Sequence, residues 1–345
     1  MGLEFLHNNG AKRMRDDTMG PLLLDNNEQS EEQDEQKNLE YEVPAEEWEP
    51  IDSNAVSVPV EWELCPNRFI DGKDLGRTVA WLQTEEWYPI PVRLSEIGAV
   101  VIRNISGQLR REWYTVERVV SMIVDPFPWY EVESFAIALQ EEGFRLLPCQ
   151  KPHNRLTYDF QEMRKATQNR TLDEMIRLEK QALVHAWDTP VLVDGRLESR
   201  SGGFDEEQCA VVGMIKGHYR DYLHARGWRV YYNLRFGQRT PAFFLKQKNI
   251  EVISWYVRID GSEGDLPNWG IVRLEIAAKF FEKLGKDWNY LNRLSHMICN
   301  YRCKDKSYER ASVSLYPIQR AEESLGALFA GTDVITHRFY NLTHL

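Results

Sequence analysis

The chain has 345 residues, a formal net charge of −11 at pH 7 and 43% hydrophobic residues. This length and composition suit a globular protein with one large domain or two modest ones. No stretch approaches about 18 consecutive apolar residues, and the N-terminus lacks the charged, apolar and small-residue order of a signal peptide. The sequence therefore predicts a cytoplasmic protein without membrane association.

The negative charge is concentrated at the N-terminus. Residues 1–50 contain 14 Asp or Glu and 4 Lys or Arg, whereas residues 51–345 contain 39 and 38. From Asn26 to about Pro50 the chain is rich in Glu, Gln, Asn and Asp, which cannot bury enough surface to offset the entropy of ordering. We predict that residues 1–55 form a largely disordered acidic tail and that residues 56–345 form the folded domain. A solubilising tail is one interpretation, and a partner-binding or DNA-mimicking segment is the other.

The first predicted elements of the folded domain are mostly strands. Residue type predicts an edge strand at 56–64, a strand that ends at Asp71-Gly72, and strands at 89–94 and 98–103 with a turn or bulge at 95–98. Short connections favour antiparallel pairing of these strands. A helix at 131–142 and a loop containing Pro148 and Pro152 follow.

A helix is predicted from Thr171 to Thr189. It opens with the spacing of a capping box, carries an apolar stripe and ends before Pro190. Glu179 falls inside that stripe. A carboxylate pointing inward requires a base, an amide cluster or a metal ion to neutralise it, unless helix fraying or a rim position exposes it.

The second half of the chain predicts more strands and then helices. Apolar runs indicate strands at 190–194, 211–216, 229–234, 241–246, 252–259 and 270–276, the last two as a hairpin, and helices at 277–301 and 317–330. The order of elements predicts an α/β fold with a mixed sheet flanked by helices, additional strands and C-terminal helices.

Three carboxylates form a candidate metal site. Asp71 and Asp194 each follow an apolar, strand-like run and precede a glycine, and Glu179 lies on the helix before the second run. Mg²⁺ and Mn²⁺ prefer oxygen ligands, and two such ions can stabilise both the attacking and the leaving oxygen in phosphodiester cleavage. Asp-Gly is also a common turn dipeptide. Period two places Glu275 beside Arg273 on one strand face, as an ion pair or as a fourth ligand.

A basic and aromatic tract follows the second aspartate. Residues 216–248 contain eight Lys or Arg, one acid and eight aromatic residues. Guanidinium groups bind phosphates and aromatic rings stack on unpaired bases, so the tract is typical of a groove for single-stranded nucleic acid. The alternative is a sheet with core aromatics and solvated arginines. The candidate DNA-binding residues are Lys216, Arg220, Arg229, Arg235 and Arg239.

The order of these segments resembles the NurA nuclease family, the partners of HerA-type hexameric DNA translocases. The matching segments are Phe-Ile-Asp-Gly at 69–72, Gly-Ala-Val-Val at 98–101, Arg-Leu-Glu at 177–179, Leu-Val-Asp-Gly-Arg-Leu at 192–197, Val-Val-Gly-Met-Ile-Lys at 211–216, Trp-Tyr-Val-Arg at 255–258, Val-Arg-Leu-Glu at 272–275 and Tyr-Pro-Ile-Gln-Arg-Ala-Glu at 316–322. They span about residues 66–330.

The resemblance implies a function. Members have an RNase H-like core, use Mn²⁺ or Mg²⁺, cut DNA ends as exonucleases and single strands as endonucleases, and pair as homodimers. The resemblance therefore implies a metal-dependent deoxyribonuclease in DNA end processing or repair. It further implies that Asp71, Glu179 and Asp194 are catalytic ligands of two ions and that Lys216 contacts a phosphate. Members carry a histidine in the C-terminal helix, where this chain has Glu322, with His337 beyond it. These two residues and Glu275 are therefore candidate auxiliary residues of the site.

Two other functions fit the same sequence. A NurA-like subunit that is weakly active or inactive could bind DNA or an ATPase without cutting, and carboxyl groups too far apart to share ions would favour it. An RNase H-like enzyme acting on RNA is the third interpretation.

Overall fold

The computed structural model describes residues 2–14, 40–59, 61–83, 89–150, 159–217, 222–261, 266–305 and 307–345. Twelve strands in these residues form one mixed sheet, with the order β2-β9-β11-β12-β8-β7-β3-β4-β5-β6, while β1 pairs with β3 and β10 pairs with β11. The strands are β1 (Lys12–Arg13), β2 (Ile51–Asp52), β3 (Arg68–Gln83), β4 (Pro89–Ile105), β5 (Gln108–Ile123), β6 (Arg145–Cys149), β7 (Val191–Asp194), β8 (Val211–Ile215), β9 (Gln238–Arg239), β10 (Phe243–Lys246), β11 (Glu251–Arg258) and β12 (Ile271–Ala277).

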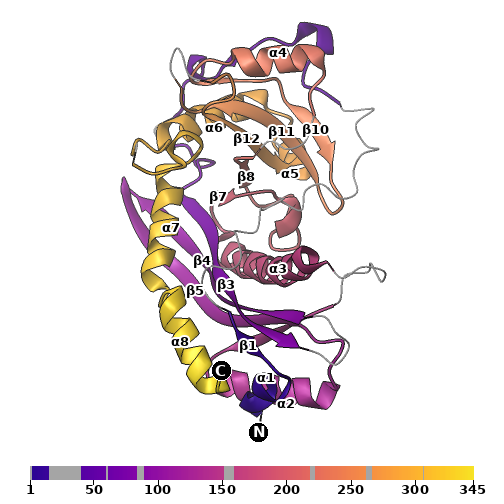
Figure 1. Ribbon diagram of the computed structural model, residues 1–345. Coiled ribbons are helices and arrows are strands. Elements are labelled where there is room, and N and C mark those ends of the chain that lie inside the picture. The colour runs from indigo at the N-terminus through magenta and orange to yellow at the C-terminus, as the bar shows by residue number, and fades with distance from the viewer. Residues whose placement is uncertain are drawn as a thin grey trace.

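Helices flank the sheet (Figure 1). They are α1 (Phe5–Asn8), α2 (Trp129–Glu141), α3 (Phe160–Ala186), α4 (Ala225–Asn233), α5 (Ala278–Lys283), α6 (Trp288–Tyr301), α7 (Tyr316–Leu328) and α8 (Thr332–Thr343), with 3-10 helices η1 (Gly2–Glu4), η4 (Ala45–Glu47), η5 (Ser53–Ala55), η6 (Glu198–Arg200) and η7 (Ala311–Val313). No helix of the described residues is both long enough and apolar enough to cross a membrane.

The centre of the sheet combines two kinds of pairing. Strands β3, β4 and β5 are long antiparallel neighbours, whereas β7 runs parallel to both β3 and β8. Strands β11 and β12 form the expected antiparallel hairpin. The predicted α/β class, with a mixed sheet flanked by helices and additional strands and C-terminal helices, is confirmed.

Helices α3 and α7 cover opposite faces of β3 and β4 (Figure 1). A Cβ atom on Gly72 would meet the side chain of Glu179 on α3, and a Cβ atom on Gly98 would meet Leu325 on α7 and Phe329 directly after it. Gly98 pairs with Lys73, the neighbour of Gly72 in β3. Since successive residues of a strand face opposite sides, these contacts assign one helix to each face.

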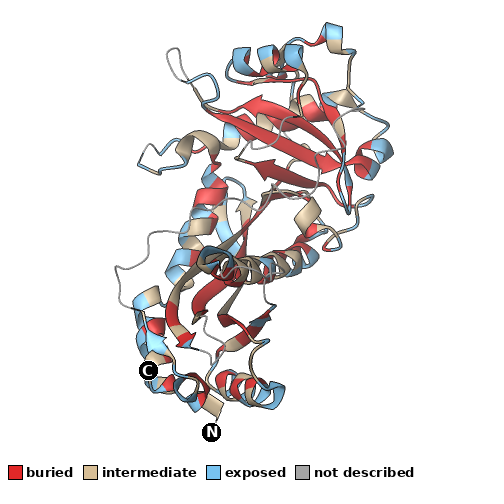
Figure 2. Ribbon diagram, turned by 45° about the vertical axis from the view of Figure 1, so that its right-hand side comes forward, coloured by how far each residue is buried: buried red, intermediate tan, exposed pale blue. Residues whose placement is uncertain are grey.

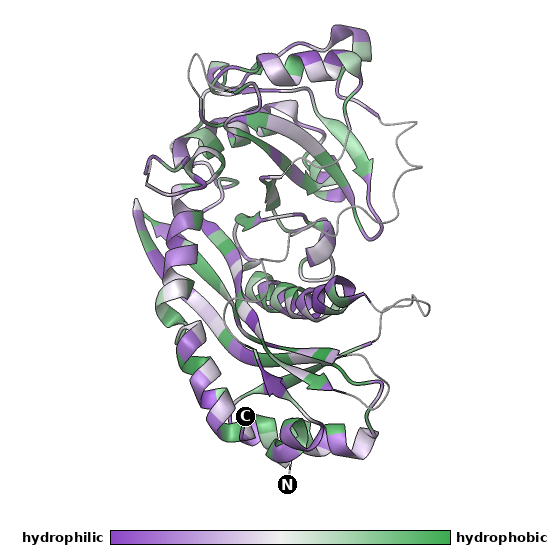
Figure 3. Cartoon of the chain, in the orientation of Figure 1, coloured by the Kyte–Doolittle hydropathy of each residue, from purple (hydrophilic) through white to green (hydrophobic). Residues whose placement is uncertain are grey.

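Two large hydrophobic clusters share the long strands. One gathers β7, β8, β11, β12 and α6, and the other gathers α1, α2 and α8 around the far ends of β3, β4 and β5. Figure 2 shows the buried residues concentrated in the strands, and Figure 3 shows hydrophobic and hydrophilic residues alternating along β3 to β5 and around α3. The long strands therefore join both clusters into one sheet.

Several strand predictions need correction. Strand β3 continues twelve residues beyond Asp71, so this aspartate lies inside a strand and not at its C-terminal end. Strand β4 runs through the expected turn at 95–98 because Glu96 is paired there with Arg118 and Gly98 packs against α7. Pro148, expected in a loop, lies in β6, which is an edge strand and tolerates proline. The described residues of 56–64 contain no strand.

The helix predictions need similar corrections. Helix α3 begins at Phe160, capped by Asp159, and Thr171 lies inside it. Residues 225–233 form helix α4 where a strand was expected at 229–234, since the buried positions Gly227, Val230 and Tyr231 follow helical spacing. The helical region at 277–301 is divided into α5 and α6 at Gly285-Lys286, where both residues have positive φ. Helix α8 was not predicted.

Two described segments of the predicted tail belong to the fold. Residues 2–14 form η1, α1 and β1, with Leu6 fully buried, and residues 40–55 include the fully buried Trp48 and the carboxylate of Glu42, which pairs with Arg239. The acidic average of residues 1–50 concealed these few anchoring side chains. The Asn26–Leu39 part of the expected disordered region lies outside the described residues.

Candidate metal centre

Asp71 and Asp194 come from adjacent parallel strands. The register of β3 and β7 pairs Phe69 with Leu192 and Ile70 with Val193. The next position on each strand is an aspartate, and Asp194 is the last residue of β7. Because side chains at paired positions face the same side of a sheet, both carboxylates emerge together on the face covered by α7.

Glu322 completes a group of three carboxylates. It lies on α7, and the grouped oxygen atoms of Asp71, Asp194 and Glu322 all lie within 4.8 Å of one another. The hydroxyl of Tyr308 donates a hydrogen bond to Glu322 Oε2 at 2.7 Å. Burial, and then this hydrogen bond, raise the pKa of Tyr308, which keeps the phenol in its donating form. Tyr308 therefore fixes the position of the Glu322 carboxylate.

The group carries more negative charge than its surroundings compensate. Asp71 is 6% exposed, and its Oδ2 atom has no hydrogen-bond partner among the described residues. Burial and the neighbouring Asp194 carboxylate raise the pKa of Asp71 well above its ordinary value. The ammonium of Lys216, just after β8, lies 2.6 Å from Asp194 Oδ2 and compensates part of this charge.

These residues fit a divalent cation. A buried carboxylate oxygen without a partner costs free energy, and three clustered carboxylates repel one another unless a positive charge joins them. Their oxygen atoms are the donor type that Mg²⁺ and Mn²⁺ prefer. Asp71, Asp194 and Glu322 are therefore the residues that could hold such an ion.

Glu179 is buried as predicted, but the structure does not group it with these acids. It is 1% exposed, and the guanidinium of Arg200 lies 2.6 Å from its Oε2 atom. Burial raises the pKa of Glu179, while Arg200 acts to lower it. Its position against Gly72 places it on the α3 face of the sheet, opposite the side chain of Asp71. Arg200 also donates a hydrogen bond to the backbone oxygen of Asp194 at 2.9 Å. Glu179 therefore stabilises the end of β7 through Arg200.

The other two auxiliary candidates lie elsewhere. Glu275 is fully buried, 3.2 Å from the guanidinium of Arg273, and it accepts a hydrogen bond from the backbone of Leu197 at 2.6 Å. The ion-pair interpretation of Glu275 is therefore confirmed. His337 is exposed on α8, where its ring contacts Asn341, and it is not part of the carboxylate group.

The basic tract separates into different environments. Arg239 is 1% exposed and donates to both carboxylate oxygens of Glu42, at 2.7 and 2.9 Å, so the prediction that it contacts DNA is wrong. Arg229 and Arg235 are exposed, and Arg220 lies outside the described residues. The rings of Tyr231 and Phe243 are buried in the core, whereas Tyr232 and Phe236 are exposed. The described part of the tract is thus partly core and partly surface.

The sequence signals for the site were unequal. Asp71, Asp194 and Lys216 follow recognisable apolar runs, but Glu322 becomes prominent only when α7 packs across β3. Tyr308, which lies in the connection between α6 and α7, carries no sequence signal of its own. Only the tertiary fold brings these two residues to the aspartates.

Comparisons with known proteins complete the description of the site. No family model matches the chain, and no curated protein matches it. Among solved structures, the crystal structure of the NurA nuclease from Sulfolobus solfataricus is similar, with a TM-score of 0.39 and 11% identity over 81% of each chain. Similarity at this level does not establish family membership, so the function has to be argued from the carboxylate group itself.

Proposed function

We propose that this protein is a metal-dependent deoxyribonuclease that cuts DNA ends and single strands. The observation that carries the proposal is the meeting of Asp71, Asp194 and Glu322, with an unpartnered buried oxygen on Asp71. Carboxylates on rigid strands and a helix are the usual support for metal-assisted phosphodiester hydrolysis. The sequence resemblance to NurA nucleases points to the same chemistry.

Each residue of the group has a role in this proposal. Asp71, Asp194 and Glu322 would hold Mn²⁺ or Mg²⁺, in a two-ion site, and Tyr308 would fix the Glu322 carboxylate. When bound, such ions lower the pKa of a water molecule and stabilise the leaving oxygen. Lys216 would meet the substrate phosphate, since its ammonium lies at the edge of the same group. Glu179 and Arg200 would position β7 and not touch the substrate.

The proposed substrate and partners are argued from features outside the carboxylate group. The exposed Arg229 and Arg235 support DNA binding through the phosphate backbone. A homodimer and a HerA-like hexameric ATPase partner, in DNA end processing, follow from the resemblance alone. Light scattering of the purified protein, alone and mixed with such an ATPase, tests both associations.

The central experiment is a cleavage assay. End-labelled linear duplex, single-stranded DNA and RNA of the same sequence are incubated with the protein in Mn²⁺, Mg²⁺ or EDTA. We expect cutting of DNA that requires metal and is abolished by Asp71→Asn but retained by Asp333→Asn, which changes an exposed acid on α8. Metal-independent cutting, or equal activity of Asp71→Asn, would contradict the proposal. Preferred cutting of RNA would favour the RNase interpretation.

A second candidate function is a non-cutting subunit that binds DNA or an ATPase. The ion pair between Lys216 and Asp194 favours it, because an ammonium can neutralise part of the carboxylate group without metal. Calorimetric titration with Mn²⁺ separates the two functions. Metal binding lost in Asp71→Asn supports the nuclease, whereas DNA binding without metal binding or cleavage supports the subunit.

A further inference from the structure

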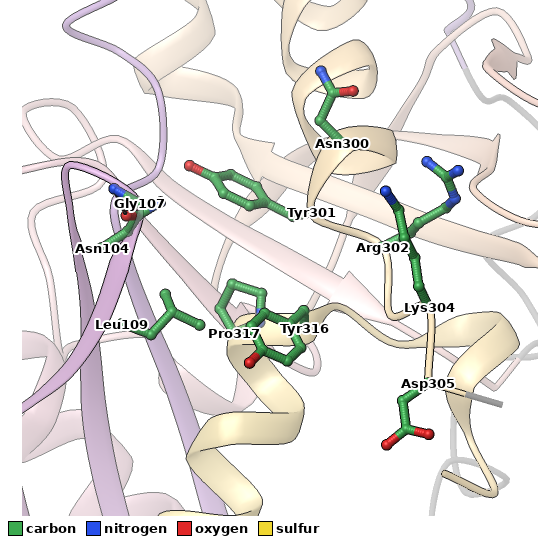
Figure 4. Close-up of a pocket in the computed structure, with 10 residues that line it drawn as sticks. All are labelled: Asn104, Gly107, Leu109, Asn300, Tyr301, Arg302, Lys304, Asp305, Tyr316 and Pro317. Atoms are coloured by element: carbon green, nitrogen blue, oxygen red, sulfur yellow. Dashed lines mark hydrogen bonds between the residues drawn. The ribbon is translucent and has the colours of Figure 1, made fainter. Parts of the chain in front are cut away.

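A pocket of about 450 Å³ lies where α6, α7 and the β4–β5 hairpin meet (Figure 4). Tyr301 from the end of α6 and Tyr316 from the start of α7 line it together with Leu109 of the hairpin. Its volume is in the range of pockets that bind small organic groups. The pocket is separate from the carboxylate group and shares no residue with it.

The pocket combines apolar and ring surfaces with two basic side chains and the carboxylate of Asp305. Tyr316 is 49% exposed, so its ring is available for stacking. Lys304 and Arg302 also line the pocket, and exposed Lys304 has no ion pair with any described carboxylate. The amides of Asn104 and Asn300 complete the lining. An aromatic face, a free ammonium and amide groups are what an unpaired base and its phosphate require.

Helix α7 connects the pocket to the carboxylate group. Tyr316 and Glu322 are six residues apart on this helix, which corresponds to about 9 Å along its axis. The connection between α6 and α7 also contacts both the pocket and the carboxylate group, because Asp305 lines the pocket and Tyr308 donates a hydrogen bond to Glu322. Asp305 is held by the amide of Gln319 on α7 at 3.2 Å. The pocket is therefore fixed relative to the three acids.

We infer that this pocket holds one unpaired base of single-stranded DNA beside the phosphate that meets the carboxylate group. The inference rests on the proposed function and adds a specificity element to it. The Tyr316 ring stacks on the base, and Lys304 contacts the adjoining phosphate. A second pocket of about 330 Å³ shares Asn300 with the first.

Binding measured without metal tests the pocket independently of cleavage. The probe is fluorescein-labelled oligothymidine in EDTA, followed by anisotropy. Base stacking contributes about 1–3 kcal/mol, so Tyr316→Ala should weaken binding by about 5- to 150-fold. Tyr316→Phe should bind like the wild type. Tyr130→Ala, a matched change at a 68% exposed tyrosine on α2, should have no effect.

Three further arms make the result specific. An abasic strand of equal length should bind wild type and Tyr316→Ala equally. Lys304→Gln should reduce the salt dependence of binding by about 0.7 in log–log slope. Oligouridine separates the two nucleic acids, and tighter binding of oligouridine than of oligothymidine would overturn the assignment to DNA.

The outcome separates this inference from the proposed function. Unchanged oligothymidine binding by Tyr316→Ala, or the same loss on the abasic strand, overturns the pocket assignment even when the wild type cuts DNA. A loss that depends on the ring and the base supports the pocket even when the wild type does not cut. Retained Mn²⁺ binding by Tyr316→Ala verifies that the carboxylate group is intact.

Discussion

At the scale of single residues, the clustered carboxylates store unfavourable charge in the metal-free protein. Burial and Asp194 raise the pKa of Asp71, so its ionised form is destabilised by folding. Asp71→Asn removes that charge while preserving the shape of the side chain. In EDTA at neutral pH, we expect the free energy of unfolding to be higher for Asp71→Asn than for the wild type. Mn²⁺ should then raise the unfolding midpoint of the wild type but not of the variant.

The same residue predicts a pH dependence with a defined sign. Because the folded pKa of Asp71 is raised, the wild type is most stable relative to Asp71→Asn below the ordinary pKa of 3.8. This advantage is lost as the pH rises from that value through the raised pKa of the folded protein. Urea denaturation of both proteins in EDTA at a series of pH values measures the difference. A wild type that becomes more stable relative to Asp71→Asn as the pH rises would contradict a raised pKa.

Glu322 and Glu179 make opposite predictions for metal binding. Glu322→Gln should weaken Mn²⁺ binding by about tenfold or more, because it removes one charged oxygen ligand from the group. Glu179→Gln should leave Mn²⁺ affinity nearly unchanged and should lower stability instead, because the buried Arg200 loses its partner. Calorimetric titration measures both affinities, with the exposed Glu133→Gln as the control. An equal loss of affinity in Glu179→Gln would restore Glu179 as a metal ligand.

The sequence predicted some of these residues better than others. Asp71 and Asp194 were identifiable because an apolar strand precedes each of them, and Glu179 because it interrupts an apolar helix stripe. The partner of Glu179 was not identifiable, since Arg200 comes 21 residues later in a short 3-10 helix. Glu322 was assigned only an auxiliary role, because its importance depends on how α7 crosses the sheet. Local pattern therefore showed which side chains point inward but not which of them meet.

At the scale of elements, the approach of α3 to β3 depends on a glycine. A Cβ atom at position 72 would lie 2.7 Å from Glu179 Oε1, and the carboxylate is held in place because its other oxygen, Oε2, pairs with Arg200. Gly72→Ala should therefore lower the free energy of unfolding by about 1–3 kcal/mol. Gly326→Ala is the matched control, since its nearest contact would be Lys73 Nζ at 3.7 Å and alanine favours a helix.

Urea denaturation of the two glycine variants measures the effect. Equal stability of Gly72→Ala and wild type would show that α3 sits farther from β3 than described. If the protein cuts DNA as proposed, Gly72→Ala should still cut at temperatures where it remains folded, because no residue of the carboxylate group is changed.

Elements were predictable where local pattern and tertiary environment agree. Strands β7, β8, β11 and β12 are short apolar runs buried in the sheet, and they occur close to where the sequence placed them. The strand prediction for this region was wrong because the aromatic and β-branched composition of residues 225–233 favours a strand, whereas the spacing of their buried positions is helical. The sequence did not show the full length of β3 and β4. Polar and glycine residues inside these strands are typical of turns, but here they pack against or hydrogen-bond to α3, α7 and the start of α8.

At the scale of the whole molecule, β3, β4 and β5 connect two hydrophobic clusters and so two ends of the fold (Figure 1). The N-terminal segment closes the cluster farthest from β7. Phe5 stacks on Phe135 of α2 with ring centroids 5.0 Å apart, and β1 adds to β3 through the pairs Lys12 with Trp81 and Arg13 with Ala80. Composition averaged over 50 residues could not reveal so short an anchoring segment.

Leu6→Ala tests whether this segment is part of the cooperative fold. Leu6 is fully buried, so its truncation should lower the free energy of unfolding by about 2–5 kcal/mol. Leu266→Ala, at a 66% exposed position, should have little effect. Because the long strands belong to both clusters, near-ultraviolet dichroism and tryptophan fluorescence should report one transition at a lower urea concentration. An unchanged urea midpoint would show that residues 2–14 do not contribute to the stability of the fold, as predicted for a tail. Two separate transitions would show that the clusters unfold independently.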